Sequence, residues 1–168
     1  MVDYTAPATP VARQPITVPG ELRGLSSNGA LLYLVGYKLE TDKLTDGQDW
    51  LHACSYDGVA SYLVDSIPLS KEWPHAVLTQ DRWIYVTRPR TGDTVPAAME
   101  VWTLNDSAKL AKLSEQSLAA NAYGLHGISD LLVAEEDGGL EFFDLTQPSQ
   151  LPRLGKGAVS GCSGFNIG

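Results

Sequence analysis

The sequence predicts an all-β protein that is built from a repeated four-stranded antiparallel unit. Strand-like apolar runs recur at fixed spacings, and no segment shows convincing helical periodicity. Turn-forming residues are also frequent, with 16 Gly and 10 Pro among 168 residues. The apolar share of 43% is enough for a folded core, which excludes a disordered chain.

The first element of the unit is a small residue followed by an apolar one. Eight positions after each of the first three small residues comes a short apolar run that is typical of a strand. These runs are Leu32–Val35, Ile84–Thr87 and Leu132–Ala134. The small residues are Gly24, Ala76, Gly124 and Gly164.

A second strand-like run follows the first in each unit. These runs are His52–Tyr56, Glu100–Leu104 and Glu141–Leu145. From the end of each run to the next small residue the distance is 20, 20 and 19 positions, and only the stretch between the two runs varies. Fixed spacings with one loop of variable length indicate a repeated supersecondary unit with surface insertions.

The spacer of each unit is expected to hold a fourth strand, around Ser61–Ile67, Lys109–Glu115 and Arg153–Val159. A helix over Ser107–Ala122 is the alternative in the second unit, although the position in the repeat favours a strand. Units of about 40–50 residues with four antiparallel strands are typical of β-propeller blades.

The sequence therefore predicts three blades, at about residues 22–67, 74–118 and 122–159, after a Pro/Ala/Thr-rich leader at 1–15. Lone strands are expected at 16–22 and 162–167. The small side chains at the start of each unit are expected to let the inner strands converge near a common axis. Four aromatic residues are expected in the layers between blades: Trp83, Trp102, Phe142 and Phe143.

One blade carries a recognisable sequence pattern. Val133-Ala134-Glu135 is followed by a glycine turn, Gly139-Leu140, Asp144-Leu145-Thr146 and Pro148. This stretch resembles an LVIVD-type propeller repeat. The other two blades resemble it loosely, because Tyr56-Asp57-Gly58 and Leu104-Asn105-Asp106 lack the trailing proline. The resemblance implies a propeller of a bacterial or archaeal surface or secreted protein, and it implies no shared catalytic residues.

Three blades do not make a closed ring, because propellers contain four to eight blades. Two sheet faces and raw strand edges would stay exposed. We therefore expect a second copy, another polypeptide or a further part of a longer protein to complete the ring. The alternative is a distorted ring of three to four blades that closes on itself.

Charge and cysteine content limit the possible partners. Lys+Arg 12 against Asp+Glu 20 gives a net charge of −8, which disfavours nucleic acid and anionic membranes. No apolar run is long enough for a membrane span. Cys54 and Cys162 are expected to be buried free thiols or to form one long-range disulfide.

Candidate site residues are few. Ser26, His126 and Asn166 share one repeat position with Leu78 and are weak candidates for ligand binding at the central channel. The three histidines have no metal-ligand spacing, and we expect no metal or cofactor. A weak calcium candidate lies in the longest loop of the first blade, formed by Asp42, Asp46 and Asp49.

Charged groups provide two further candidates. Arg82, Arg88 and Arg90 flank a strand of the second blade and are a weak candidate for a basic rim that binds a carboxylated partner. The acidic run at 135–139 is expected to be a solvated hairpin turn. Tyr33, Tyr85 and Trp83 at strand spacing are expected to pack in the core.

The leading functional hypothesis is a non-catalytic propeller segment for assembly or protein recognition. No nucleophile-elbow, phosphate-loop or zinc-protease motif occurs in the sequence. The alternative is a ligand-binding or enzymatic propeller whose site at the axis forms only in the complete ring. The family resemblance favours an extracytoplasmic protein.

Overall fold

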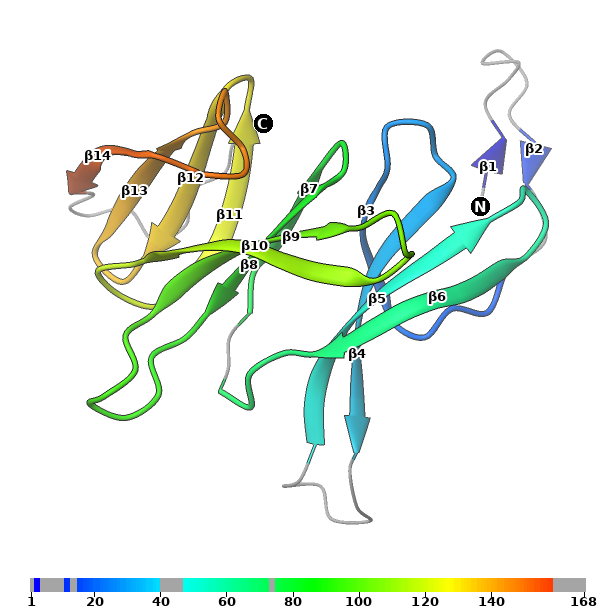
Figure 1. The fold of residues 1–168 in the computed structure, drawn as a ribbon, viewed down its shortest axis with the longest axis horizontal. Coiled ribbons are helices and arrows are strands. Elements are labelled where there is room, and N and C mark those ends of the chain that lie inside the picture. Colours follow the sequence, from blue (N-terminus) through cyan, green and yellow to red (C-terminus); the bar gives the residue numbers. More distant parts are fainter. Residues whose placement is uncertain (1, 4–10, 13–14, 40–46, 73–74, 159–168) are drawn as a thin grey trace.

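The computed structural model describes residues 2–3, 11–12, 15–39, 47–72 and 75–158. Every regular element in these ranges is a β-strand, which confirms the prediction of an all-β chain. The strands form three four-stranded antiparallel sheets, called blades below, and one two-stranded pair (Figure 1). In each blade the strands pair with their neighbours in chain order.

The strand bounds are as follows. The first blade contains β3 (Glu21–Leu25), β4 (Leu31–Leu39), β5 (Gly47–Tyr56) and β6 (Ser61–Pro68). The second contains β7 (Val77–Gln80), β8 (Trp83–Arg88), β9 (Ala98–Leu104) and β10 (Leu110–Ser117). The third contains β11 (Ala122–Ile128), β12 (Leu131–Glu136), β13 (Gly139–Asp144) and β14 (Arg153–Ala158).

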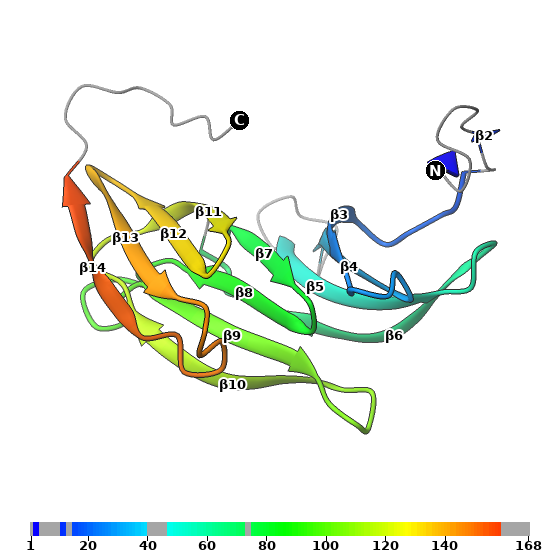
Figure 2. The same cartoon turned by 90° about the horizontal axis from the view of Figure 1, so that it is seen from above.

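The three blades pack beside one another, and they lie closest together at their inner strands. The inner strands β3 and β7 contact each other, as do β7 and β11. The outer strands β6, β10 and β14 lie on the opposite side of their sheets (Figure 2). The described blades do not close into a ring, so the first and third each have a face that turns away from the second.

Two apolar layers between the blades form most of the core. Side chains alternate along each strand, so Tyr33 of β4 faces the second blade while Leu32 and Leu34 face away from it. The layer between the second and third blades contains Met99, Leu132, Phe143 and other buried residues. Full burial of each large side chain contributes about 1.5–3 kcal/mol.

Several expectations need correction at the termini. The lone strand expected at Ile16–Leu22 is wrong, because residues 15–18 form no strand and Leu22 belongs to β3. The leader contains two short strands, β1 (Val2–Asp3) and β2 (Val11–Ala12), which pair with each other. The lone strand expected at 162–167, with Gly164, lies outside the described residues.

Two open alternatives are decided by the structure. The segment expected to be either helix or strand forms the outer strand β10. Cys54 is a buried free thiol, and burial raises its pKa above the ordinary value. Cys162 lies outside the described residues. No described segment forms a helix with the length and apolar character that a bilayer crossing needs.

The small residues of the repeat have different roles. A Cβ atom added at Gly24 would collide with the side chain of Thr79, so this glycine permits the close approach of β3 and β7. Ala76 is buried beside β7. Gly124 instead makes room for Glu135 of its own blade, 2.8 Å from an added Cβ. The close approach of β11 to β7 is at Gly127, where Leu78 would lie 3.3 Å from a Cβ.

We expect Gly24→Ala to lower the free energy of unfolding by about 1–3 kcal/mol, because the added methyl group overpacks the contact with β7. Gly155→Ala is the matched control, since nothing lies within 4 Å of a Cβ there. That control is expected to be neutral or to stabilise by up to about 1 kcal/mol. Urea unfolding of both variants measures the difference, and equal effects would contradict the assigned contact.

Candidate functional site

The outer face of the first blade is the strongest candidate for a functional surface. We define it as the side of β3–β6 that turns away from the second blade. Leu32, Leu34 and Cys54 form a buried cluster there, and each is at most 3% exposed. This blade therefore has buried apolar residues on both sides. A sheet with one side in water has them on one side only.

The internal repeat shows that the equivalent faces of the other two blades are each covered by a neighbouring blade. Leu32 corresponds to Ile84, 52 positions later, and to Leu132, a further 48 positions on. Ile84 is buried in the layer between the first and second blades, and Leu132 in the layer between the second and third. The outer face of the first blade thus has the residues that a preceding blade covers in the other two.

A short segment of the chain, residues 15–18, covers part of this face; we call it the strap. Ile16 and Val18 of the strap pack against the buried cluster of the outer face. The Ser61 hydroxyl donates a hydrogen bond of 3.0 Å to the Thr17 carbonyl oxygen. An added Cβ at Gly36 would collide with the Pro19 carbonyl oxygen, so the chain that follows the strap passes close over β4.

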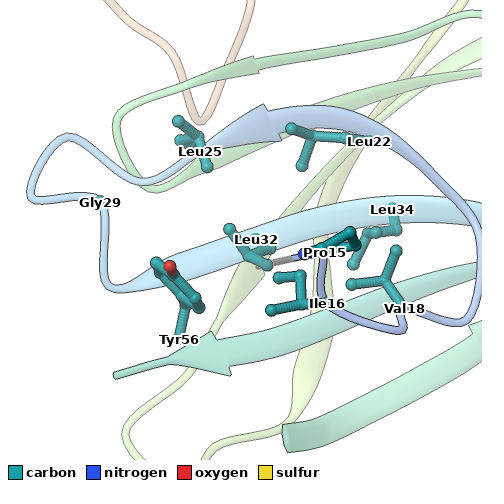
Figure 3. A pocket seen from close by; sticks show the side chains of 9 residues that line it. All are labelled: Pro15, Ile16, Val18, Leu22, Leu25, Gly29, Leu32, Leu34 and Tyr56. Carbon is teal, nitrogen blue, oxygen red and sulfur yellow. The ribbon is translucent and has the colours of Figure 1, made fainter. Parts of the chain in front are cut away.

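An open groove remains between the strap and β3 (Figure 3). It has a volume of about 570 Å³. Its walls are almost entirely apolar, and the exposed fractions of Leu22, Leu25 and Leu63 on this face are 53%, 49% and 58%. The lining residues are Pro15, Ile16, Val18, Leu22, Leu25, Gly29, Leu32, Leu34 and Tyr56. A contiguous exposed patch of this kind is typical of a protein interaction site.

The third blade has a corresponding outer face. Because Leu132, Ala134 and Phe143 face the second blade, their strand neighbours point the other way. On β11, Gly127 meets Leu78 of the second blade, so His126 and Ile128 point outward. The residues of this second outer face are His126, Ile128, Val133, Phe142 and Gly155. Phe142 was expected between blades and lies here instead.

The residues expected at the channel are placed as follows. Ser26 lies in the turn after β3, where its hydroxyl contacts Asn28 at 2.7 Å and accepts a hydrogen bond from the Leu31 amide. His126 lies on the inner strand β11, with Nε2 at 3.5 Å from a Glu135 carboxylate oxygen. Asn166 lies outside the described residues. The Ser26 hydroxyl is thus occupied in closing a turn.

The calcium candidate lies only in part among the described residues. Asp49 lies within β5, opposite Tyr37 of β4, because the two strands continue beyond the predicted ends. Asp42 and Asp46 lie outside the described residues. Among the residues that are described, no three His, Cys, Asp or Glu side chains lie close enough together to hold a metal ion.

Of the three arginines proposed for a basic rim, Arg88 is engaged by carboxylates of its own blade. Arg88 pairs with Glu115 at 2.7 Å and with Glu100 at 3.4 Å. Arg82 lies over the Trp83 ring, 4.7 Å from its centroid. The backbone amide of Arg90 donates to Asn121. The charge of Arg88 is therefore neutralised by two carboxylates of its own blade.

Sequence reasoning missed a pair of buried carboxylates between the second and third blades. Glu136 and Glu141 are 6% and 0% exposed. Arg153 Nε lies 2.9 Å and Lys156 Nζ 3.4 Å from one Glu141 oxygen. Burial, together with the neighbouring Glu141, raises the pKa of Glu136 from 4.5 to about 6. The acidic run was expected to be solvated, but strand alternation from Leu132 turns Glu136 inward.

This carboxylate pair predicts a pH dependence of stability. Because the pKa of Glu136 is raised to about 6 on folding, the folded chain binds more protons than the unfolded chain between about pH 4.5 and 6. Stability should fall as the pH rises through this window, by about 2 kcal/mol. Glu136→Gln should abolish that loss in urea unfolding at pH 4.5 and 7.5. An unchanged pH profile in the variant would contradict the assignment.

Comparison with known proteins adds no family assignment. No protein-family model and no curated protein matches the sequence. The resemblance of the third blade to an LVIVD-type repeat therefore stays a prediction.

Proposed function

We propose that this chain is a non-catalytic propeller segment that recognises another β-sheet through the outer face of its first blade. One observation carries the proposal: Leu32 and Leu34 occupy repeat positions that a neighbouring blade buries in both other cases. The half-exposed Leu22 and Leu25 extend the same face toward the inner side. Covering Leu22 and Leu25, which the strap leaves half-exposed, supplies the main driving force for association.

A fluorescent dye that binds exposed apolar surfaces, the anion anilinonaphthalene sulfonate, tests whether the face is available to a partner. At low protein concentration the dye should bind the unmodified chain, and Leu25→Glu should weaken that binding about tenfold, because it puts a charge in the groove. Leu113→Glu is the matched control: Leu113 on β10 is 47% exposed, against 49% for Leu25, and lies away from the groove. Absence of dye binding, or equal effects of the two variants, would contradict the proposal.

A further inference from the structure

We infer that the partner of the first blade is the third blade of a second copy, so that two copies join head to tail into one ring. This inference rests on the proposed function and names its partner. It follows from the internal repeat, from the residues of the second outer face and from the number of blades.

The two interfaces within the chain define which face meets which. In the first interface, the side of the second blade that contains Ile84 packs against the side of the first blade that contains Tyr33. In the second interface, the side of the third blade that contains Leu132 packs against the side of the second blade that contains Tyr85. Ile84 and Leu132 are the repeat equivalents of Leu32, so the Leu32-equivalent side always meets the other side of the preceding blade. That opposite side contains Tyr33 in the first blade and Tyr85 in the second, and the corresponding residue of the third is Val133. The outer face of the third blade is therefore the same kind of surface that already covers Ile84 and Leu132.

Exposed apolar residues are present on both inner strands that this contact would bring together. Leu22 and Leu25 on β3 are 53% and 49% exposed, and Ile128 on β11 is 44% exposed. Inner strands of successive blades already contact each other twice in the chain. Placing β11 of one copy beside β3 of the other would make a third contact between inner strands of successive blades. This contact would cover Leu22, Leu25 and Ile128.

The strap leaves room for this contact. Its apolar residues Ile16 and Val18 point into the cluster of the outer face, whereas Pro15 and Thr17 are exposed. A docking sheet would meet β3 directly and would cross the outward side of the strap.

The number of blades favours two copies. The described part of each copy contributes three blades, so two copies contribute six, which lies within the range of four to eight in closed propellers. Three copies would exceed that range. Head-to-tail contacts that close after two copies leave no apolar end face exposed, whereas contacts that do not close would produce filaments.

The test uses two blocking variants and light-scattering mass measurement over a range of protein concentrations. Leu25→Glu blocks the face on the first blade, and Ile128→Glu blocks the face on the third. The unmodified chain should form a dimer of twice 18.1 kDa. Each variant alone should raise the dissociation constant about 100-fold, because every contact then contains a buried charge. Leu113→Glu should dimerise like the unmodified chain.

Mixing the two variants separates this arrangement from others. In a head-to-tail contact one intact pair of faces remains in the mixture, so an equimolar mixture should recover dimer mass that neither variant shows alone. Gly155→Glu should behave like Ile128→Glu. No atom of the same copy lies within 4 Å of a Cβ at position 155, so the new side chain fits within one copy. Circular dichroism must show that each variant is folded.

Three results would overturn the inference. A dimer of Ile128→Glu alone would mean that two first-blade faces meet each other, and a mixture that stays monomeric would exclude the head-to-tail contact. An unmodified chain that stays monomeric while binding the dye would also overturn it, but would leave the proposed function intact with a different partner. If the unmodified chain does not bind the dye at low protein concentration, the proposed function itself is wrong.

Discussion

Phe143→Ala is expected to lower the free energy of unfolding by about 3–5 kcal/mol. Phe143 of β13 is 0% exposed and lies in the layer between the second and third blades. Removing its ring leaves a cavity in a layer where Leu132, Met99 and Leu151 are themselves fully buried. Urea unfolding at pH 7.5 measures the loss from the transition midpoint and slope.

The neighbouring residue supplies the control for Phe143. Phe142 has the same ring on the same strand, but it faces outward and is only partly buried. Phe142→Ala should cost less than about 2 kcal/mol, because little of the ring's area is removed from water within one copy. The comparison is made at a protein concentration at which both variants are monomeric. Equal losses would mean that the core is not organised in layers between the blades.

Arg153→Met is expected to lower the free energy of unfolding by about 3 kcal/mol at pH 7.5. The guanidinium of Arg153 pairs with the fully buried Glu141, lies 6.0 Å from the Phe143 ring centroid and donates to the Ser117 carbonyl oxygen of the second blade. Methionine keeps much of the side-chain length but removes the charge. The Glu141 carboxylate is then left in the layer without its closest cation.

Lys156→Met is the matched control for Arg153. Lys156 also faces Glu141, but its ammonium is 3.4 Å away and its side chain is 49% exposed. We expect a loss below about 1 kcal/mol, because in this variant Arg153, whose side chain is 40% exposed, still pairs with Glu141 at 2.9 Å. If both variants cost the same in urea unfolding, then Arg153 is not the residue that compensates the buried carboxylate.

The sequence predicted the repeat well because one physical requirement recurs in every unit. Each blade needs apolar residues at alternate positions on its central strands, whereas the repeat glycines Gly24 and Gly124 meet different neighbours. The runs that begin at Leu32, Ile84 and Leu132 therefore identify β4, β8 and β12 from spacing alone.

The strap could not be distinguished from a strand by its pattern. Ile16 and Val18 alternate with Thr17 as strand residues do, and the alternation correctly indicates that one side is buried. Pro15 and Pro19 on either side lack a backbone N–H, which disfavours regular ladder pairing. The segment instead lies across a sheet face, and spacing alone contains no information about that placement.

Face assignments failed where two adjacent residues have the same character. Phe142 and Phe143 are both aromatic, so the pattern does not show which one faces the second blade. A register shift between these two positions in the pairing with β14 weakens the alternation further. Glu136 was missed because acidic turn residues are usually solvated, although counting by twos from Leu132 would have found it.

The measurement that tests the central claim most directly compares the labelling of Leu25 and Leu113 by hydroxyl radicals as the protein is concentrated. The two leucines have nearly the same exposed fraction, 49% and 47%, so they should label alike in dilute solution. If the outer face of the first blade receives another blade, labelling of Leu25 falls several-fold at high concentration while that of Leu113 is unchanged. Equal labelling of the two leucines at every concentration would contradict this account of the face as a docking surface between copies.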